Sequence, residues 1–299
     1  MINIFFCVNQ RYQREIRVNR HLSQLQKKAI KNIFSPNSMS NKELKVSLIQ
    51  TDLIWENPQA NRDKHTLLLK QLKGKTNIAI LPEMFTTGFT MYPERLAEPA
   101  NGDTLLWMQK VANELGFAIC GSVMVKENDL YFNRFYFVEP NGKFHTYNKR
   151  HLFRMMDEHN HYQMGTERVI LTYLGWRIMP QICYDLRFPV WSRNQNDYDL
   201  LIYVANFPTA RQMAWNKLLP ARAIENLCYV AAVNRIGTDG NGIPFSGDSQ
   251  VMDPKGQIVF EAESNKQTVE TVSLSLSELN DYRTKFPAHL DADNFTLET

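Results

Sequence analysis

Cysteine is scarce in this chain of 299 residues, and its four cysteines lie far apart. No two of them have the Cys-x-x-Cys spacing of a zinc or redox site, and three lie in or beside apolar runs that are typical of strands. This pattern argues against a disulfide framework and indicates reduced thiols in an intracellular protein, so we predict a cytoplasmic location. The four are Cys7, Cys120, Cys183 and Cys228.

Long apolar runs, internal repeats and linker-like segments are missing as well. No run approaches the roughly 18 apolar residues that a membrane span needs, so we expect no membrane association. After Met39 there is no Pro- or Ser-rich stretch and no repeat of fixed period, which makes a single domain the simplest interpretation. A content of 43% hydrophobic and 22% charged residues is ordinary for a globular protein.

Acidic residues are nearly absent from the first 38 residues, which hold seven Lys and Arg but a single acid, Glu15. This segment carries a net charge of +6, which leaves −3 for the rest of a chain whose total is +3. The basic total therefore does not indicate nucleic-acid binding, and the remainder has no basic-aromatic stripe that would.

The N-terminal segment is open to three interpretations. Its apolar start is too short for a secretory signal and lacks the preceding basic region, whereas a basic and acid-poor segment could be an organelle presequence. It could also be a loosely ordered extension, or lie upstream of a natural start at Met39. We expect residues 1–42 to be a basic extension that is poorly ordered or not native, and residues 43–299 to form the globular domain.

From Lys45 onward, segments rich in Val, Ile and aromatic residues alternate with segments of helical periodicity. This alternation, with hairpins as well as crossovers, predicts a layered α/β domain. Gly116 is placed to follow a helix as its C′ residue, and Asn141-Gly142 predicts a hairpin turn. Strands are expected in KVSLIQT, NIAILPE, FAICGSVMV, YFNRFYFV, RVILTYL, WRIMPQIC, DLLIYVAN and LCYVAAVNR, and helices in NRDKHTLLLKQL, TLLWMQKVANELG and QMAWNKLLPARAIEN.

A carboxylate follows one of the apolar runs. In NIAILPEMF, residues 78–81 are typical of a strand that is buried on both faces; Pro82 ends the run and Glu83 follows directly. Burial at a strand end favours proton uptake by a carboxylate, as the work of a general base requires. A glutamate satisfied by a helix N-terminus or an arginine is equally compatible with this segment alone.

Cys183 has the same setting. In PQICYDLRFP it ends an apolar run, and Phe188-Pro189 opens what looks like a helix. The turn would leave backbone N–H groups free, chiefly that of Tyr184, and these could stabilise an oxyanion, while a nearby cation would lower the pKa of the thiol. Free cysteine is more often an inert core residue, so both interpretations stay open at this point.

Lys149 is less distinctive by itself. In FHTYNKRHLF it lies between Tyr147 and the apolar pair Leu152-Phe153, so its stem could be buried with the ammonium group directed at a site. Taken alone, the segment favours the alternative, an exposed lysine at a strand edge.

Together, the glutamate, the lysine and the cysteine stand at strand ends in an order and spacing that resemble the nitrilase superfamily, the carbon–nitrogen hydrolases. The resemblance covers nearly the whole body of the chain. It runs from VSLIQTD through NIAILPEMF, YNKRHLF and PQICYDLRFP to YVANFPTAR, LPARAIENLCYVAAVNRIG and GDSQVMDPKG. It implies a four-layer αββα sandwich over residues 43–299, whose subunits pair across helices beside the active site as a homodimer or higher homo-oligomer.

The resemblance also implies roles for single residues. Glu83 matches the family's general base, Lys149 its catalytic lysine and Cys183 its nucleophile, in an enzyme that needs no cofactor and no metal. EHNHYQMG resembles the family's second-glutamate region, which places Glu158 near the lysine. Tyr184 would then supply the backbone N–H group that helps to bind the oxyanion.

Two other chemistries are conceivable. A His-x-His pair puts both imidazoles on one face of a strand, which could suit zinc, and a cysteine paired with a histidine could act as in a protease. The resemblance gives the glutamate of this segment another role, and nothing in the sequence positions a histidine against Cys183. The potential zinc ligands are Asp157, Glu158, His159, His161 and, just upstream, His151.

Besides Tyr184, we expect four residues at the substrate pocket. Asn206 and Phe207 should wall it, because DLLIYVAN ends at the same sheet edge as the cysteine strand. Phe153 follows the lysine segment, and Arg187 is a candidate for substrate contact. For Arg187, however, we favour a structural ion pair with Asp185 or Glu225 over direct contact.

Three segments, KRHLFRMMDEHNHYQMG, CYDLRFPVWSRN and YRTKFPAHLDAD, resemble the bacterial ω-amidase group of this superfamily. That group implies hydrolysis of the ω-amide of a small 2-oxo acid, such as 2-oxoglutaramate or 2-oxosuccinamate, to the acid and ammonia through a cysteine thioester. It also implies a cationic or amide-rich lining for the substrate carboxylate.

Other functions remain open. The chain could be another amidase or an N-carbamoyl hydrolase of the superfamily, or a non-catalytic dimeric module that binds a ligand or senses redox state through Cys183. The intact triad argues against the last, because a scaffold has no physical reason to aim a glutamate, a lysine and a thiol at one point.

Overall fold

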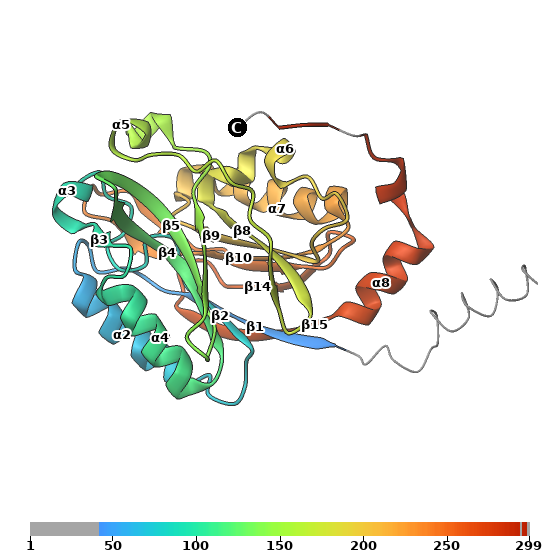
Figure 1. The fold of residues 1–299 in the computed structure, drawn as a ribbon, viewed down its shortest axis with the longest axis horizontal. Coiled ribbons are helices and arrows are strands. Elements are labelled where there is room, and N and C mark those ends of the chain that lie inside the picture. The colour runs from blue at the N-terminus through green and yellow to red at the C-terminus, as the bar shows by residue number, and fades with distance from the viewer. Residues whose placement is uncertain (1–41, 294, 298–299) are drawn as a thin grey trace, which may run out of the picture. The chain divides into compact units, whose positions relative to one another are not determined.

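The computed structural model of the protein describes residues 42–293 and 295–297. The extension predicted over residues 1–42 lies outside the described residues, apart from its last residue, so its nature stays a prediction. The described chain forms two β-sheets with helices on their outer faces (Figure 1).

The first sheet has the strand order β15-β1-β2-β4-β5-β6, and the short β3 pairs with β4. Its centre is parallel, since β1 pairs in parallel with β2 and β2 with β4, while β15, β5 and β6 are antiparallel to their neighbours. The strands are β1 Glu43–Gln50, β2 Ile78–Ile80, β3 Glu98–Pro99, β4 Ala118–Glu127, β5 Leu130–Val138, β6 Phe144–Asn148 and β15 Thr268–Ser275.

The second sheet repeats this plan with the order β14-β13-β10-β9-β8-β7. Strands β8, β9 and β10 are parallel, and antiparallel strands complete both edges. A separate hairpin is formed by β11 and β12. The strands are β7 Leu171–Tyr173, β8 Trp176–Ile182, β9 Leu200–Ala205, β10 Tyr229–Asn234, β11 Ile236–Thr238, β12 Pro244–Ser246, β13 Gln250–Met252 and β14 Ile258–Glu261.

The continuous apolar run in β2 reflects burial on both faces. Ile78 and Ile80 belong to the core cluster that lies between the two sheets, whereas Ala79 and Leu81 belong to the cluster beneath the outer helices of the first sheet. Because successive side chains of a strand point to opposite faces, a strand that lies between two packed layers needs apolar residues at every position.

Helices cover both outer faces, so the predicted four-layer αββα sandwich is confirmed. Apolar residues of α2 and α4 pack on the first sheet, and those of α7 pack on the second (Figure 1). The helices are α2 Pro58–Lys70, α3 Pro93–Leu96, α4 Asp103–Leu115, α5 Glu158–His161, α6 Pro189–Ser192, α7 Gln212–Asn226 and α8 Leu276–Lys285, with short 3₁₀ helices η2 Arg154–Met156, η3 Cys183–Arg187, η4 Thr209–Arg211 and η5 Ala288–Asp291.

Local signals in the sequence agree with these elements. Gly116 follows α4 with φ +80° and donates its N–H group to the carbonyl of Ala112, as a C-terminal glycine in the left-handed conformation does. The predicted hairpin joins β5 to β6, with Gly142 at φ +84° and its N–H group bonded to the carbonyl of Glu139. The helix expected over QMAWNKLLPARAIEN is α7.

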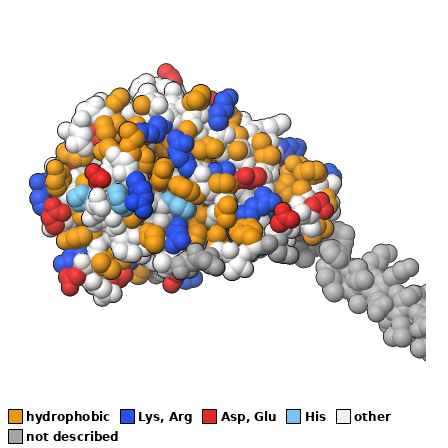
Figure 2. Space-filling view, turned by 90° about the horizontal axis from the view of Figure 1, so that it is seen from above, with side chains coloured by type: hydrophobic (Ala, Val, Ile, Leu, Met, Phe, Trp, Pro, Cys, Tyr) orange, Lys and Arg blue, Asp and Glu red, His pale blue; other side chains and the backbone are white. Residues whose placement is uncertain are grey.

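Parallel strands from both sheets position the site. Strands β2, β8 and β9 end at one edge of the sandwich, and the residues that follow them include Glu83, Cys183 and Asn206. None of the helices in residues 42–293 is both long and apolar enough to cross a membrane. On the face seen in Figure 2, Lys and Arg are interspersed with apolar and acidic side chains rather than drawn into one stripe.

Candidate active site

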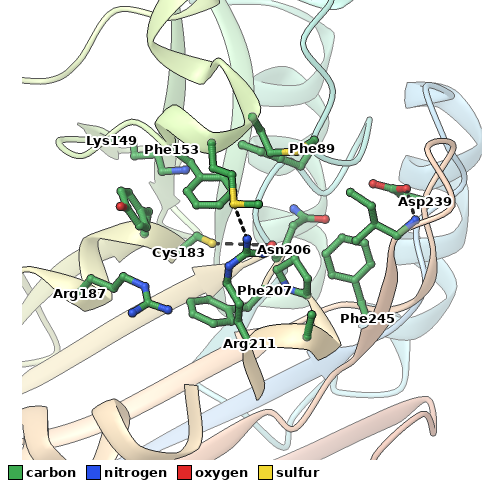
Figure 3. Close-up of a pocket in the computed structure, with 16 residues that line it drawn as sticks. Phe89, Lys149, Phe153, Cys183, Arg187, Asn206, Phe207, Arg211, Asp239 and Phe245 are labelled. Carbon is green, nitrogen blue, oxygen red and sulfur yellow. Dashed lines mark hydrogen bonds between the residues drawn. The ribbon is translucent and has the colours of Figure 1, made fainter. Parts of the chain in front are cut away.

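A cavity of about 290 Å³ opens at the strand ends that carry Cys183 and Asn206. Its wall is largely aromatic and aliphatic, with a small number of polar groups, the usual make-up of a small-molecule site. Figure 3 shows these side chains arranged around the thiol. The apolar wall includes Phe89, Phe153, Met155, Met156, Phe207, Ile243 and Phe245, and the polar groups belong to Lys149, Cys183, Tyr184, Arg187, Asn206, Arg211 and Asp239.

Glu83 lies beside this cavity with its side chain fully buried. Its Oε1 accepts hydrogen bonds from Lys149 Nζ (2.9 Å) and Asn133 Nδ2 (2.7 Å), and its Oε2 accepts one from the backbone N–H group of Asn206 (2.8 Å). The turn after β2 is fixed by the N–H group of Met84, which donates to Ser122 Oγ of β4. The carboxylate is therefore held by donors in β5 and directly after β6 and β9 before any substrate arrives.

Lys149 follows β6 and is 99% buried, which contradicts the exposed position that its segment alone favoured. Its ammonium group donates to Glu83 and to both oxygens of Glu158 (3.0 Å each), and it lies over the ring of Phe89. Burial by itself lowers the pKa of Lys149, but the charges of Glu158 and Glu83 outweigh it and raise that pKa above its ordinary value. The lysine is thus a fixed cation at the edge of the cavity.

Glu158 begins α5 and lies behind the lysine, where its side chain is fully buried. Its Oε2 also accepts a hydrogen bond from the N–H group of Phe153 (2.5 Å). Burial, reinforced by the charge of Glu83, raises the pKa of Glu158 even though Lys149 opposes the shift. The predicted position near the lysine agrees with this geometry.

Cys183 is the first residue of η3, at the point where β8 ends, and it is partly exposed where it borders the cavity. Its φ of +43° is in the left-handed region, which costs a residue other than glycine of order 1–3 kcal/mol. The sharp turn aims the side chain at the cavity, with Sγ 3.8 Å from the carbonyl oxygen of Asn206 (Figure 3). Tyr184 is the next residue of η3, whose first N–H groups have no carbonyl acceptor within the helix.

The thiol of Cys183 is poised as a protonated group. Burial raises its pKa well above the ordinary value, and the neighbouring carboxylate of Glu83 raises it further, while Lys149 opposes both. We expected from the sequence that a nearby cation would lower this pKa, and Lys149 acts in that direction. The cation is present, but burial and Glu83 dominate, so the thiol needs a base that removes its proton as it reacts.

All five residues expected at the pocket line the cavity: Phe153, Tyr184, Arg187, Asn206 and Phe207. The structural ion pair that we favoured for Arg187 is wrong, because its guanidinium group pairs with neither suggested acid. Asp185 is occupied by other donors, and Glu225 accepts from Arg222 (2.9 Å). Arg187 is exposed and faces the cavity instead.

Arg211, which was not predicted from the sequence, also lines the cavity. Its guanidinium group lies over the ring of Phe153 and donates to Met155 Sδ (2.7 Å), and no acidic side chain pairs with it among the described residues. Arg211 ends the segment YVANFPTAR, so a cation shortly after the strand that precedes Asn206 was the available signal. Two arginines of the cavity thus have no carboxylate partner in the part of the chain that the structure describes.

The alternative chemistries find little support in the geometry. Within residues 42–293 and 295–297, no group of three or more His, Cys, Asp and Glu side chains is arranged to hold a metal ion. Two of the potential zinc ligands have other partners, since Glu158 accepts from Lys149 and His151 donates from Nδ1 to Asp185 Oδ1 (2.8 Å).

Comparisons with known proteins give a consistent result. The sequence model of the Carbon-nitrogen hydrolase family matches residues 45–284. The "Omega-amidase YafV" of Escherichia coli strain K12 is 48% identical to the chain over 254 residues, which cover 85% of the chain and 98% of that protein. The "2-oxoglutaramate amidase" of Bacillus subtilis strain 168 is 32% identical over 251 residues, or 82% of the chain and 96% of that protein.

A solved structure agrees at the level of the fold. XC1258 from Xanthomonas campestris, described as a CN-hydrolase superfamily protein with an arsenic adduct in its active site, is 45% identical and superposes with a TM-score of 0.84. The match covers 86% of the chain and 99% of that structure.

Proposed function

Because the chain belongs to the carbon–nitrogen hydrolase family, we propose that it is an ω-amidase, which hydrolyses the terminal amide of a small 2-oxo acid to the acid and ammonia. The observation that carries this proposal is the contact of Glu83 with Lys149 and with a cavity-facing Cys183, beside two arginines that pair with no acidic side chain among the described residues. The similarity to an ω-amidase and to a 2-oxoglutaramate amidase supports the substrate class.

In the proposed mechanism, Glu83 takes the proton of the Cys183 thiol as sulfur attacks the amide carbon. The oxyanion that forms is stabilised by the ammonium group of Lys149 and the N–H group of Tyr184. The carbon–nitrogen bond then breaks, and nitrogen leaves as ammonia with the proton returned by Glu83. A thioester on Cys183 remains.

Hydrolysis of the thioester reuses the same groups. Glu83 takes a proton from water as the water oxygen attacks the thioester carbon, and the carbon–sulfur bond breaks to release the acid. The proton returns to sulfur, which restores the thiol that its raised pKa favours. Glu158 keeps Lys149 in place and charged throughout, since its carboxylate raises the pKa of that lysine.

The two arginines supply the selectivity for a carboxylate at the far end of the substrate. Arg187 and Arg211 both line the cavity, and neither pairs with an acidic side chain among the described residues. A guanidinium group binds a carboxylate through two parallel hydrogen bonds, which makes an unpaired arginine a natural partner for one. Phe153 and Phe207 would pack against the short carbon chain between the carboxylate and the amide.

Release of ammonia from 2-oxoglutaramate tests the proposal, with glutamine, asparagine and a simple nitrile in parallel and Cys183→Ala as the control. We expect selective turnover of the keto-amide that the substitution abolishes. Turnover of a different amide would keep the thioester mechanism and replace the substrate, as another amidase or an N-carbamoyl hydrolase requires. A folded protein that releases ammonia from no amide in a broad panel would favour the non-catalytic module.

Two further properties belong to the proposal. We expect the enzyme to act in the cytoplasm, where its thiols stay reduced, and to assemble as a homodimer or higher homo-oligomer across helices beside the active site. Sedimentation or light scattering at several concentrations measures the second property, and a monomer at every concentration would contradict it.

A further inference from the structure

Asp185 is a fully buried carboxylate that receives four hydrogen bonds, two on each oxygen. Its Oδ1 accepts from the backbone N–H group (3.0 Å) and the ring Nδ1 (2.8 Å) of His151. Its Oδ2 accepts from the backbone N–H group of Ile182 (3.0 Å) and the hydroxyl group of Tyr147 (2.8 Å). A carboxylate has about four lone-pair sites, so this one is saturated by donors.

The donors flank the reacting groups. Ile182 directly precedes Cys183 at the end of β8, while Tyr147 and His151 stand two residues before and two residues after Lys149. One carboxylate therefore connects the turn that carries the thiol to the segment that carries the ammonium group. These two segments come from different sheets, so nothing in the strand ladders fixes their relative position.

The main chain of Asp185 strengthens the same turn. Its carbonyl accepts the N–H group of Phe188 (3.0 Å), and the next carbonyl, that of Leu186, accepts from Arg222 (2.6 Å). Together with the bond from Ile182, these contacts hold the chain on both sides of Cys183, whose φ of +43° is rare for a residue other than glycine.

We propose that Asp185 is a positioning residue that sets the placement of Cys183 relative to Lys149. The inference rests on the proposed function for the roles of those two residues. Asp185 does not contact the cavity, and it acts through the segments that it joins.

The arrangement requires a carboxylate rather than an amide. In Asp185→Asn, one oxygen becomes an NH₂ group, and in either orientation that group faces two donors. On the Oδ1 side, a change of tautomer lets the ring of His151 accept a hydrogen bond, but its backbone N–H group still opposes the amide. The substitution therefore disrupts the hydrogen bonds that connect the two segments, at nearly constant side-chain volume.

The test compares wild-type enzyme with Asp185→Asn, measuring turnover of the keto-amide and alkylation of Cys183 by iodoacetamide across pH. We expect kcat to fall roughly 10- to 100-fold with KM changed less than about threefold, because a small misplacement of reacting groups has that effect. The midpoint of the alkylation profile should move down toward the value of an ordinary thiol, since a displaced thiol escapes the surroundings that raise its pKa.

Asp199→Asn is the matched control. Asp199 is also a buried acid; its partners are Arg177 and Arg283, and none of the three lines the cavity. The control should lose thermal stability. Its kcat should stay within about twofold of wild type, and its alkylation midpoint within a few tenths of a pH unit. An Asp185→Asn enzyme that behaves in the same way overturns the proposal.

Two milder variants keep the test decisive where Asp185→Asn fails to fold. Tyr147→Phe and His151→Phe each remove one donor and leave the carboxylate in place, and each should lower kcat and the alkylation midpoint in the same direction by smaller amounts. Wild-type kinetics in both variants would overturn the proposal. If the wild-type enzyme itself releases no ammonia from the keto-amide, the proposed function fails, whereas the alkylation profiles still decide whether Asp185 positions the thiol.

Discussion

Glu83 and Asn206 are joined by two hydrogen bonds across the two sheets. The backbone N–H group of Asn206 donates to Oε2 of Glu83 (2.8 Å), and its side-chain Nδ2 donates to the carbonyl oxygen of Glu83 (2.6 Å). Glu83 follows β2 of the first sheet and Asn206 follows β9 of the second, so this pair fixes the two strand ends at the site relative to each other.

The hydrogen bond from the side chain of Asn206 should contribute measurably to the free energy of unfolding. Asn206→Ala removes the Nδ2 donor and leaves the backbone bond, so a buried carbonyl group loses its partner. We expect a loss of about 1–3 kcal/mol in the free energy of unfolding, measured by urea denaturation. Asn113→Ala is the control, because the Nδ2 group of Asn113 also donates to a backbone carbonyl, but at an exposed position. Equal losses in the two variants would contradict the prediction.

Removal of the Glu83 charge should shift the titration of Cys183. The carboxylate is one of the causes that raise the pKa of the thiol, and Lys149 opposes them. In Glu83→Gln the midpoint of iodoacetamide alkylation should therefore fall, while kcat for the keto-amide decreases by roughly 10²- to 10⁴-fold through loss of the general base.

Lys149→Met should shift the alkylation midpoint of Cys183 in the opposite direction. The variant removes the charge that lowers the pKa of Cys183, so its alkylation midpoint should rise above that of the wild type. Shifts in the same direction for Glu83→Gln and Lys149→Met would show that the variants perturb the thiol through general loosening of the site rather than through their charges.

Arg211 should discriminate carboxylate substrates from neutral ones. Arg211→Met removes a guanidinium group that has no acidic partner among the described residues, so kcat/KM for 2-oxoglutaramate should fall roughly 10- to 100-fold, the range for a hydrogen bond to a charged group. Turnover of pentanamide, a neutral amide of the same chain length, should change less than about threefold.

Arg154→Met separates a specific contact from a general effect of charge. Arg154 begins η2 beside Met155, is exposed and does not line the cavity. This variant should retain wild-type kcat/KM for both substrates at moderate ionic strength, because the charge of an exposed side chain is screened by water and salt. A similar loss for Arg154→Met and Arg211→Met would assign the effect to net charge.

Much of the architecture could be predicted because local sequence patterns indicate it. The two-sided apolar run at residues 78–81 indicated a strand between layers, and Gly116 and Asn141-Gly142 marked a helix end and a hairpin. The order of the glutamate, lysine and cysteine segments, through the resemblance that they carry, indicated the remaining layers.

The pocket lining was harder to predict, because it depends on contacts between residues far apart in the chain. Arg187 was expected to pair with Asp185 or Glu225. Donors from Tyr147, His151 and Ile182 already saturate Asp185, however. Likewise, the direction of the Cys183 shift depends on how far burial and Glu83 outweigh Lys149, which no segment reveals alone.

Acid stability should depend on Asp199. Burial by itself raises the pKa of this carboxyl group, but its bonds to Arg177 and the charges of Arg177 and Arg283 outweigh burial and hold the pKa below its ordinary value. A folded-state pKa that is lowered contributes stability that is present above the unfolded-state pKa of about 3.9 and is lost as the pH falls through the folded-state value.

Asp199→Asn should therefore be less stable than wild type by about 3 kcal/mol at pH 7, since it leaves the buried Arg283 and the partly exposed Arg177 without their acid. The gap in the free energy of unfolding should narrow as the pH falls from 4 toward 2. Urea denaturation across this range measures the gap. Asp129→Asn, which removes an exposed partner of Lys126, should be as stable as wild type within the error of the measurement at every pH. A gap for Asp199→Asn that is as wide at pH 2 as at pH 7 would mean that the side chain stabilises the fold through packing rather than through its charge.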